Sequence, residues 1–216
     1  SRGLGDVYKR QSIDYYGNWK AMHYQAKRAF APVLVDAIKE GDDLNIYVMS
    51  DKLEADKDVT LQLRLMDFDG KVLKKQEIKG EVPANASTLY YKEKYEGMTP
   101  NPRNTFLLMT LKNKKGEVLS EEIYYFNFAK DQDLPKADIR YKVKQMDGKC
   151  EITLSSKQLA RDVFIEIPKQ LEPTLLESSL QGARFSDNFF DLLPGQTKKV
   201  VVTSEELLKD GKLDIR

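Results

Sequence analysis

Apolar and polar residues alternate along most of this chain, beginning at Val33. The clearest stretch has Val59, Leu61, Leu63 and Leu65 separated by polar residues. Such a period of two predicts a strand with one face on a core and the other in water. Comparable patterns predict strands at residues 33–38, 44–48, 59–65, 72–78, 86–91, 105–111 and 118–128.

The spacing of these strands predicts an immunoglobulin-like sandwich. About seven strands follow one another with turn residues every 8 to 12 positions, as in that fold. Asp69-Gly70 favours the positive φ angles of a tight hairpin. Residues 105–111 are apolar on both faces and are expected to form a central strand.

A second sandwich is expected after the polar, proline-bearing stretch 131–136. Alternation returns there, Asp147-Gly148 supplies one turn, and Pro194-Gly195 supplies another before the last well-defined strand. The expected strands are residues 139–143, 150–154, 163–167, 187–192 and 198–202, with a final strand beginning near Leu213 and Ile215.

Residues 12–32 break this pattern and predict an amphipathic helix. Trp19, Met22, His23, Ala26 and Phe30 recur at spacings of three and four, which places them on one face. Asn18 is a candidate N-cap, and Pro32 is expected to end the helix. No core precedes this apolar stripe, so we expect the chain to come from a longer parent protein that holds part of its partner surface. The sandwiches of this chain are expected to dock on that parent and to bury the stripe from Trp19 to Phe30.

Composition excludes some partners. The 35 basic and 34 acidic residues leave a net charge of +1, which does not indicate binding to nucleic acid or to an anionic membrane. No apolar run approaches the ~18 residues of a membrane span. Cys150 is the only cysteine, so no internal disulfide can form, and its alternating neighbours predict a small buried core residue.

Catalytic motifs are scarce. One histidine, His23, and one cysteine argue against zinc sites and against the usual Ser-His-Asp or Cys-His systems. Asp67 and Asp69 before Gly70 resemble the start of a calcium loop, but no further ligands follow, and a turn is favoured. Glu205 follows small hydroxyl residues, as some nucleophiles do, but Thr203 with Glu206 fits a helix capping box better.

Five tyrosines offer one alternative function. A sandwich face carrying them could stack on sugar rings in a carbohydrate-binding module. Alternation sends neighbouring side chains to opposite faces, so packing in the core or in an interface is favoured. The tyrosines are Tyr90, Tyr91, Tyr95, Tyr124 and Tyr125.

Two motifs resemble one enzyme family. Residues 12–32, SIDYYGNWKAMHYQAKRAFAP, resemble the end of the catalytic barrel in β-mannosidases of glycoside hydrolase family 2. Residues 185–195, FSDNFFDLLPG, resemble a signature of the terminal immunoglobulin-like domain of the same enzymes. The resemblance implies a multidomain parent that releases terminal β-linked mannose with retention, using two glutamates of the barrel.

Neither of those glutamates is carried over to this chain. The family's acid/base follows an asparagine, and no Asn-Glu pair occurs here; the nucleophile also lies upstream of the matched residues. Tyr15, Tyr16 and Trp19 lie in the first motif, with no catalytic role to transfer. We therefore expect no catalytic, substrate-binding or metal-binding residue and no cofactor.

The predicted architecture is mainly β: two immunoglobulin-like β-sandwiches preceded by one amphipathic α-helix. Residues 1–11 are expected to be a disordered or junction segment, and residues 12–32 the terminal helix of a missing TIM barrel. Residues 33–132 form the first sandwich, and residues 133–216 the second, which is expected to lack part of its last strand.

The predicted function is that of the accessory region of a retaining exo-β-mannosidase, non-catalytic by itself. The alternatives are a carbohydrate-binding or adhesion module, or the same region of an exo-β-glucosaminidase or β-galactosidase. Expected partners are the barrel of the parent chain, mannose-containing glycans through that parent, and a second copy in a homodimer, but neither nucleic acid nor membrane. Bacterial members of the family imply a periplasmic or extracellular location.

Overall fold

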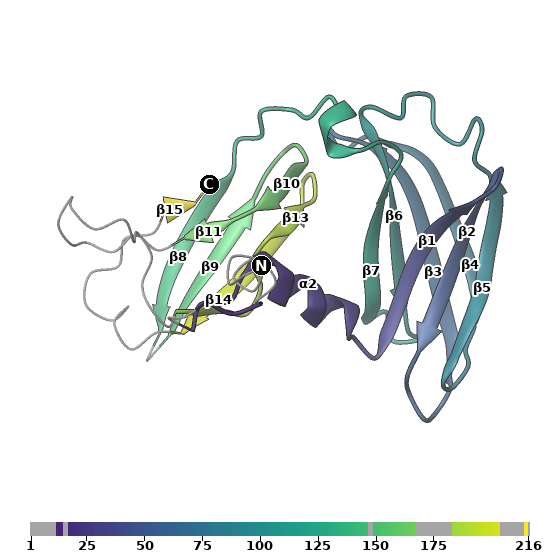
Figure 1. The fold of residues 1–216 in the computed structure, drawn as a ribbon, viewed down its shortest axis with the longest axis horizontal. Coiled ribbons are helices and arrows are strands. Elements are labelled where there is room, and N and C mark those ends of the chain that lie inside the picture. Colours follow the sequence, from purple (N-terminus) through teal and green to yellow (C-terminus); the bar gives the residue numbers. More distant parts are fainter. Residues whose placement is uncertain (1–11, 15–16, 147–148, 167–182, 204–213, 216) are drawn as a thin grey trace, which may run out of the picture. The chain divides into compact units, whose positions relative to one another are not determined.

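The protein was analysed as a computed structural model that describes residues 12–14, 17–146, 149–166, 183–203 and 214–215 (Figure 1). These residues form two compact units. The first unit comprises residues 30–135. The second unit joins the described residues up to Ala29 with those from Lys136 onward, so the N-terminal helix belongs with the C-terminal strands.

Seven antiparallel strands in two sheets make up the first unit. One sheet has the order β1-β2-β5 and the other the order β4-β3-β6-β7. The strands are β1 (Val33–Glu40), β2 (Asp43–Ser50), β3 (Asp56–Asp67), β4 (Val72–Val82), β5 (Ala86–Lys94), β6 (Thr105–Lys112) and β7 (Val118–Tyr125).

Packing in this unit follows the sequence pattern closely. Val59, Leu61, Leu63 and Leu65 of β3 are buried between the sheets, and the residues between them are partly exposed. Strand β6 lies between β3 and β7, and its residues Thr105 to Leu111 are all buried, as expected of a central strand. The Asp69-Gly70 turn is confirmed, because Gly70 has φ 92° and its amide donates to the carbonyl of Asp67.

The second unit has shorter strands. A four-stranded sheet has the order β12-β14-β9-β8, and two pairs, β10-β13 and β11-β15, supply the remaining ladders. The strands are β8 (Arg140–Met146), β9 (Lys149–Ser155), β10 (Ala160–Val163), β11 (Ile165–Glu166), β12 (Arg184–Phe185), β13 (Phe190–Leu192), β14 (Thr197–Thr203) and β15 (Asp214–Ile215). A 3-10 helix, η1 (Ala129–Asp131), follows β7 in the first unit.

The core of the second unit is small and apolar. It joins alternate residues of β9 and β14 to residues from β10, β11 and β13. The predicted strand at residues 187–192 was wrong in its first half, because β13 begins only at Phe190 and the preceding residues form a loop. The final strand is present, since Ile215 of β15 pairs with Ile165 of β11.

The helix α2 (Ala21–Ala29) is shorter than the predicted 12–32. Residues before it form a small loop that the Ile13–Trp19 bridge closes. In this loop the amide and side-chain Nδ2 of Asn18 donate to the Asp14 carboxylate at 2.8 and 3.0 Å. Asn18 is therefore committed to the loop, and the prediction that it caps the helix was wrong.

The mainly β fold class with immunoglobulin-like sandwiches and one preceding helix is confirmed for the described residues. Several predictions fall outside them. These are the junction at residues 1–11, Tyr15 and Tyr16, the turn at residues 147–148 and the capping box completed by Glu206.

Candidate functional site

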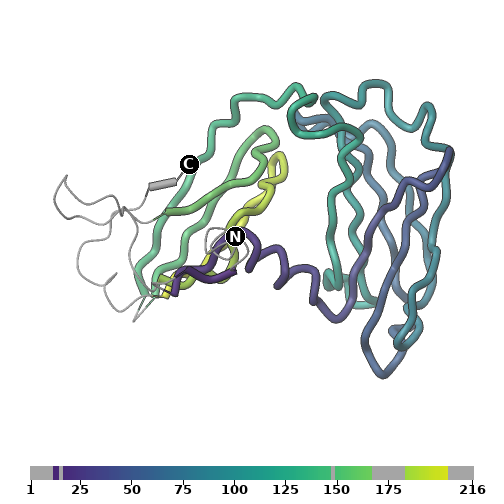
Figure 2. The backbone as a smooth tube through the Cα atoms, viewed as in Figure 1, coloured from purple at the N-terminus to yellow at the C-terminus, as the bar shows by residue number. Residues whose placement is uncertain are grey.

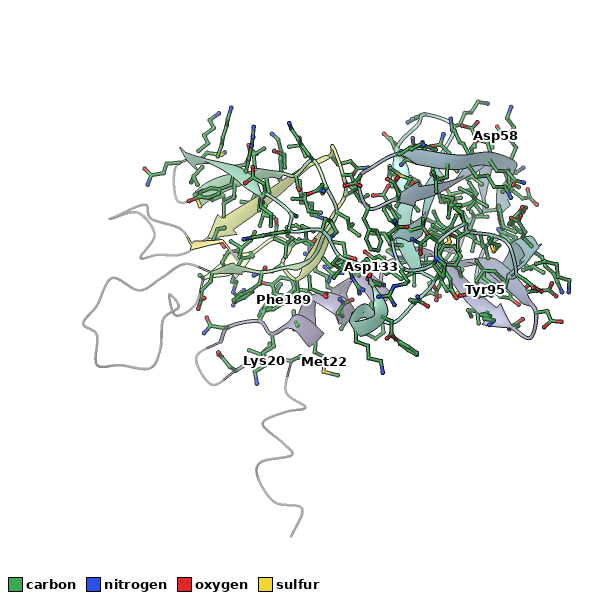
Figure 3. All side chains as sticks on the ribbon, turned by 90° about the horizontal axis from the view of Figure 1, so that it is seen from above. Lys20, Met22, Asp58, Tyr95, Asp133 and Phe189 are labelled. Carbon is green, nitrogen blue, oxygen red and sulfur yellow. The ribbon has the colours of Figure 1, made fainter. Side chains whose placement is uncertain are left out.

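The helix α2 packs on residues of the second unit of this chain. Its buried residue is Tyr24, which is 1% exposed and lies 6.0 Å from the ring of Phe189, centroid to centroid. Phe189 follows β12 and lies beside the helix (Figure 3). The N-terminal segment runs next to the C-terminal strands of the same unit (Figure 2).

The predicted apolar stripe is only partly covered. Met22 remains 59% exposed and Phe30 86% exposed, whereas Trp19 and His23 are half-buried. The ring of His23 lies 4.1 Å from that of Trp19. The stripe was predicted from the spacing of apolar residues, and Tyr24 was not included because its hydroxyl group is polar. The packed face is thus rotated away from the predicted one.

A half-buried arginine holds the helix end. Arg28 donates to the Asp187 carboxylate at 2.6 Å, to the carbonyl of Phe189 at 2.7 Å and to the carbonyl of Asn188 at 3.3 Å. The planar guanidinium suits such convergent acceptors, which a lysine cannot engage together. Lys27 adds a bond to the carbonyl of Ser186 at 2.8 Å. We call this set of contacts, from Lys27 and Arg28 to residues 186–189, the helix clamp.

One acid serves two cations at the helix clamp. The Asp187 carboxylate also pairs with Lys198 of β14 at 2.7 Å, so two cations share one acid. Lys27 and Arg28 lie in the last turn of α2, where the negative end of the helix dipole favours cations. The Asp187 carboxylate and the negative end of the helix dipole both attract Arg28, and both therefore stabilise the docked helix.

Asn188 builds the loop that receives the helix. It is 2% exposed, and its side-chain amide bonds both backbone groups of Ile165, which also pairs with Ile215 in the ladder of β11 and β15. Its Oδ1 accepts from the amide of Ile165 at 2.8 Å, and its Nδ2 donates to the carbonyl of the same residue at 2.9 Å. Oδ1 also accepts from the amide of Phe189 at 3.0 Å. Buried backbone groups need such partners, which explains a buried asparagine here.

The next residue, Phe189, has φ 51°, a conformation that a bulky side chain rarely adopts. The turn directs its ring between two aromatic neighbours. Phe164 stacks on it at 4.7 Å, and Tyr24 contacts it from the helix. Backbone strain of this kind persists where surrounding contacts over-determine it. The Asn188 bonds and the two ring contacts supply that support.

Burial in this contact changes the acidity of Tyr24. Desolvation raises the pKa of Tyr24 to about 12, the nearby Asp187 carboxylate acts in the same direction, and the backbone amide of Phe185 opposes them. The phenol is therefore neutral at physiological pH and works as a packing and hydrogen-bonding group.

A pocket of about 250 Å³ lies beside this contact, between the segment around Trp19 and the loop after β12. Aromatic rings form much of its wall, and residues from β11 complete it. Its lining includes Trp19, Tyr24, Phe164, Phe185 and Phe189 together with Asn188. These are the same residues that dock the helix, so the pocket belongs to the docking contact.

The residues weighed for chemistry lie apart from one another. Cys150 is buried in the core of the second unit, as predicted, and burial raises the pKa of its thiol. Asp67 Oδ1 accepts from the amides of Asp69 and Lys71, which is turn geometry. Among the described residues, no group of three or more His, Cys, Asp and Glu side chains is arranged to hold a metal ion.

The five tyrosines considered for a stacking platform lie in the first unit and are half-buried, and four of them pack on its core. Tyr95 donates to the carbonyl of Phe126 at 3.0 Å, and Lys39 covers its ring at 4.2 Å. Tyr125 contacts Phe68 and Phe106. The packing interpretation of these tyrosines is confirmed, and they form no open stacking platform in the described part of the chain.

Sequence reasoning missed Arg28, Asp187 and Asn188 as functional residues. One signal was present, because Asp187 and Asn188, which directly follow Ser186, put three consecutive polar residues at the start of the expected strand 187–192. Such a run interrupts the alternation, and it marks the loop that binds the helix.

Comparison with known protein families identifies both sandwich regions. A family model described as a mannosidase Ig/CBM-like domain matches residues 42–131, and a model described as an Ig-fold domain matches residues 134–214. The β-mannosidase A of Aspergillus oryzae is 27% identical over 97% of the chain, and the β-mannosidase of Capra hircus is 28% identical over 91%. The chain belongs to the immunoglobulin-like region of the family 2 β-mannosidases.

Solved structures agree with this assignment. The β-D-mannosidase of Dictyoglomus thermophilum matches 95% of this chain with a TM-score of 0.76 and 26% identity. An exo-chitosanase of Amycolatopsis orientalis matches 95% with a TM-score of 0.67, but at 16% identity it supports the fold alone. The chain spans about a quarter of the length of its relatives, 24% for the Aspergillus oryzae and Dictyoglomus proteins. No described helix is long and apolar enough to span a membrane.

Proposed function

We propose that this chain is the accessory region of a retaining exo-acting β-mannosidase, and that it supports a catalytic barrel of the same parent chain. The observation that carries the proposal is the helix clamp. A segment that resembles the end of a family 2 barrel is bound by the FSDNFF motif of the last sandwich, through Arg28 and Tyr24. Both motifs thus serve one contact.

The role assigned to the contact is mechanical. Residues 12–32 are the last element of the barrel, and the sandwiches are residues 33–132 and 133–216. The terminal sandwich holds that last element by aromatic packing and by charged hydrogen bonds, whose net contribution is about 1–2 kcal/mol because the Arg28 side chain is partly exposed. Holding the end of a barrel limits fraying of its last helix. The chain itself supplies no catalytic glutamate.

The substrate of the parent is terminal β-linked mannose. The names of the relatives from Aspergillus oryzae and Capra hircus support this sugar. The exo-chitosanase neighbour keeps an exo-β-glucosaminidase as the second candidate, because the same fold occurs in it. Half-burial of the five tyrosines disfavours a glycan-stacking module in the first unit. A homodimer stays a prediction, with no surface assigned to it.

The test is to express the whole reading frame that contains this chain and to assay aryl β-glycosides. We expect turnover of the β-mannoside, with retention of configuration followed by NMR, and at least tenfold lower kcat/KM for the β-glucosaminide and β-galactoside. The chain of 216 residues alone should show none. A preference for the β-glucosaminide would replace mannose by glucosamine as the proposed substrate sugar of the parent. Turnover by the isolated chain would overturn the accessory role.

The helix clamp gives a second readout in the same enzyme. Arg28→Ala should lower the thermal midpoint of the parent and leave KM for the aryl mannoside unchanged, because the residue supports the fold and does not bind substrate. Arg103→Ala is the matched control, since Arg103 pairs with Asp133 on an exposed surface of the first unit. Equal midpoints for both variants would remove the supporting role from the helix clamp.

A further inference from the structure

The outer face of the sheet β12-β14-β9-β8 carries an excess of positive charge. Register defines this face. Alternate residues of β9 and β14, including Ile152 and Val200, point into the core, so the residues between them point outward. Lys142 of β8 lies opposite Thr153 of β9, which lies opposite Lys199 of β14. Each strand of the sheet therefore contributes to a single outward surface.

On the described strands, six cations lie on that surface, and all six are exposed. Glu151 is the only acid at an outward position of these described strands. The chain as a whole carries a net charge of +1, so this face is much more basic than the chain average. We call these residues the basic face: Arg140, Lys142 and Lys144 of β8, Lys149 of β9, Arg184 of β12 and Lys199 of β14.

Most of these cations have no acidic partner. Lys199 pairs with Glu151 at 3.2 Å, and Arg140 pairs with Asp138, beside the start of β8, at 3.4 Å. The other four form no ion pair with any residue that the structure describes. Lysines of the first unit contrast with them, since Lys74 pairs with Glu93 at 2.5 Å.

The arrangement concentrates like charges. Neighbouring strands lie about 5 Å apart, and residues two apart on one strand about 7 Å apart. Like charges at such spacing repel one another and lower stability, unless counter-charge is supplied. A polymer with regularly repeated negative charges relieves this repulsion along the whole sheet. An isolated anion would relieve it at one place only.

Protection of a sheet edge explains only part of this pattern. Lysines on an edge strand discourage pairing with another chain, and β8 is an edge strand in the described sheet. That role accounts for Arg140, Lys142 and Lys144. It does not account for Lys199, because β14 lies between two paired strands.

The other outward residues select the kind of polyanion. Hydroxyl groups lie between the cations, from Thr153 and Ser155 of β9 and Thr197 of β14. Hydroxyls can exchange hydrogen bonds with sugar hydroxyls. No aromatic ring occupies an outward position on the described strands of this sheet, whereas proteins that bind single strands of nucleic acid stack bases on such rings. A flat sheet face also inserts no element into the groove of duplex DNA.

We propose that the basic face binds an acidic polysaccharide, a glycan chain carrying carboxylate or sulfate groups. The ligand lies across the strands, with its anions on the lysines and arginines and its hydroxyls on Thr153, Ser155 and Thr197. The surface is separate from the helix clamp. It therefore goes beyond the proposed β-mannosidase role and does not depend on it.

The experiment measures binding of the chain of 216 residues to polymannuronate in low salt, by affinity electrophoresis and by calorimetry. We expect binding that weakens steeply between 50 and 200 mM salt, as for any polyanion contact made by several cations. Neutral galactomannan should not bind. Duplex DNA and phosphatidylserine vesicles serve as rival ligands, and tighter binding to either one overturns the proposal.

Variants locate the surface. Lys142→Gln with Lys144→Gln and Lys149→Gln should weaken binding at least tenfold. Arg184→Gln with Lys199→Gln avoids β8, so that loss of binding cannot follow from association through an unprotected edge, and should weaken binding at least fivefold. The matched control replaces Lys57, Lys79 and Lys115 of the first unit by Gln, which removes the same charge as the triple variant, and should change affinity less than threefold.

Folding of every variant is checked by the reactivity of the buried Cys150 thiol, which must stay slow. Equal losses in the triple variant and its control would show a general charge effect and refute the surface. Unchanged binding in the Arg184 and Lys199 variant would do the same. Failure of the aryl mannoside assay on the parent enzyme would leave this proposal untouched, because no measurement here uses catalysis.

Discussion

The two units of this chain reach a stable sandwich by different means. In the first unit, long strands alternate cleanly, and β6 is buried on both faces between β3 and β7. In the second unit, β8 is exposed along its whole length, and several ladders contain only two residue pairs. The first unit therefore rests on its own ladders and core. The second also depends on side-chain hydrogen bonds from Asn188 and on a helix from far upstream in the sequence.

Removal of the helix should give the largest difference in stability between the two units. A protein lacking residues 1–29 loses the burial of Tyr24, worth about 2 kcal/mol, and the charged bonds of Arg28, worth about 2 kcal/mol. We expect the Cys150 thiol to react with a disulfide reagent at least a hundredfold faster. Residues 30–135 alone should keep a cooperative unfolding transition. An unchanged thiol rate, or failure of residues 30–135 to fold, would contradict the comparison.

Asn188 should rank next. Asn188→Ala leaves the buried amide and carbonyl of Ile165 without partners, which costs about 3 kcal/mol. Asn188→Asp keeps an acceptor but loses the donor to the carbonyl, and it should be no better than Ala. Denaturant unfolding followed by fluorescence of Trp19, the only tryptophan, reports on this unit. Asn104→Ala in the first unit is the control and should leave the Trp19 transition in place.

Arg28 should have a smaller effect. Arg28→Ala removes one half-buried guanidinium that donates to three acceptors, and we expect the free energy of unfolding to fall by about 1–2 kcal/mol. Arg28→Lys should recover less than half of that loss, because one ammonium cannot engage convergent acceptors together. Arg103→Ala, at the exposed pair with Asp133, should leave the unfolding midpoint unchanged. If Lys restored full stability, charge alone would explain the contact.

Alkaline pH should produce the smallest effect. The pKa of Tyr24 is raised to about 12, above its unfolded value near 10, so the folded state holds the proton longer. The resulting stability is fully present below pH 10 and is lost as the pH rises through 12. In the first unit the pKa of Tyr124 is also raised to about 12, chiefly by burial. Absorbance of tyrosinate should show both ionising late.

Tyr24→Phe provides the check on that titration. The variant should lose one late-ionising phenol and keep the one from Tyr124. Its unfolding midpoint, measured by Trp19 fluorescence, should then no longer decrease as the pH is raised from 10 to 12. An early ionisation of Tyr24, near pH 10, would mean that the helix is not packed on the second unit in solution.

The short strands of the second unit were the harder part to predict. The strand at residues 187–192 was placed by its apolar residues, yet Asn188 points its amide at Ile165 and Phe189 adopts a positive φ. Both features depend on residues more than twenty positions away. The helix face was misplaced for a related reason, since burial of Tyr24 depends on the ring of Phe189.

Sequence alone determined the mainly β class, the strands of the first unit, its Asp69-Gly70 turn and the burial of Cys150. These follow from local chemistry, because alternation and turn dipeptides act over a few residues. Tertiary structure alone decided which face of the helix is packed, the helix clamp and the basic face. Each of these arises where distant segments meet or where strands align in register, and no local pattern encodes such a meeting.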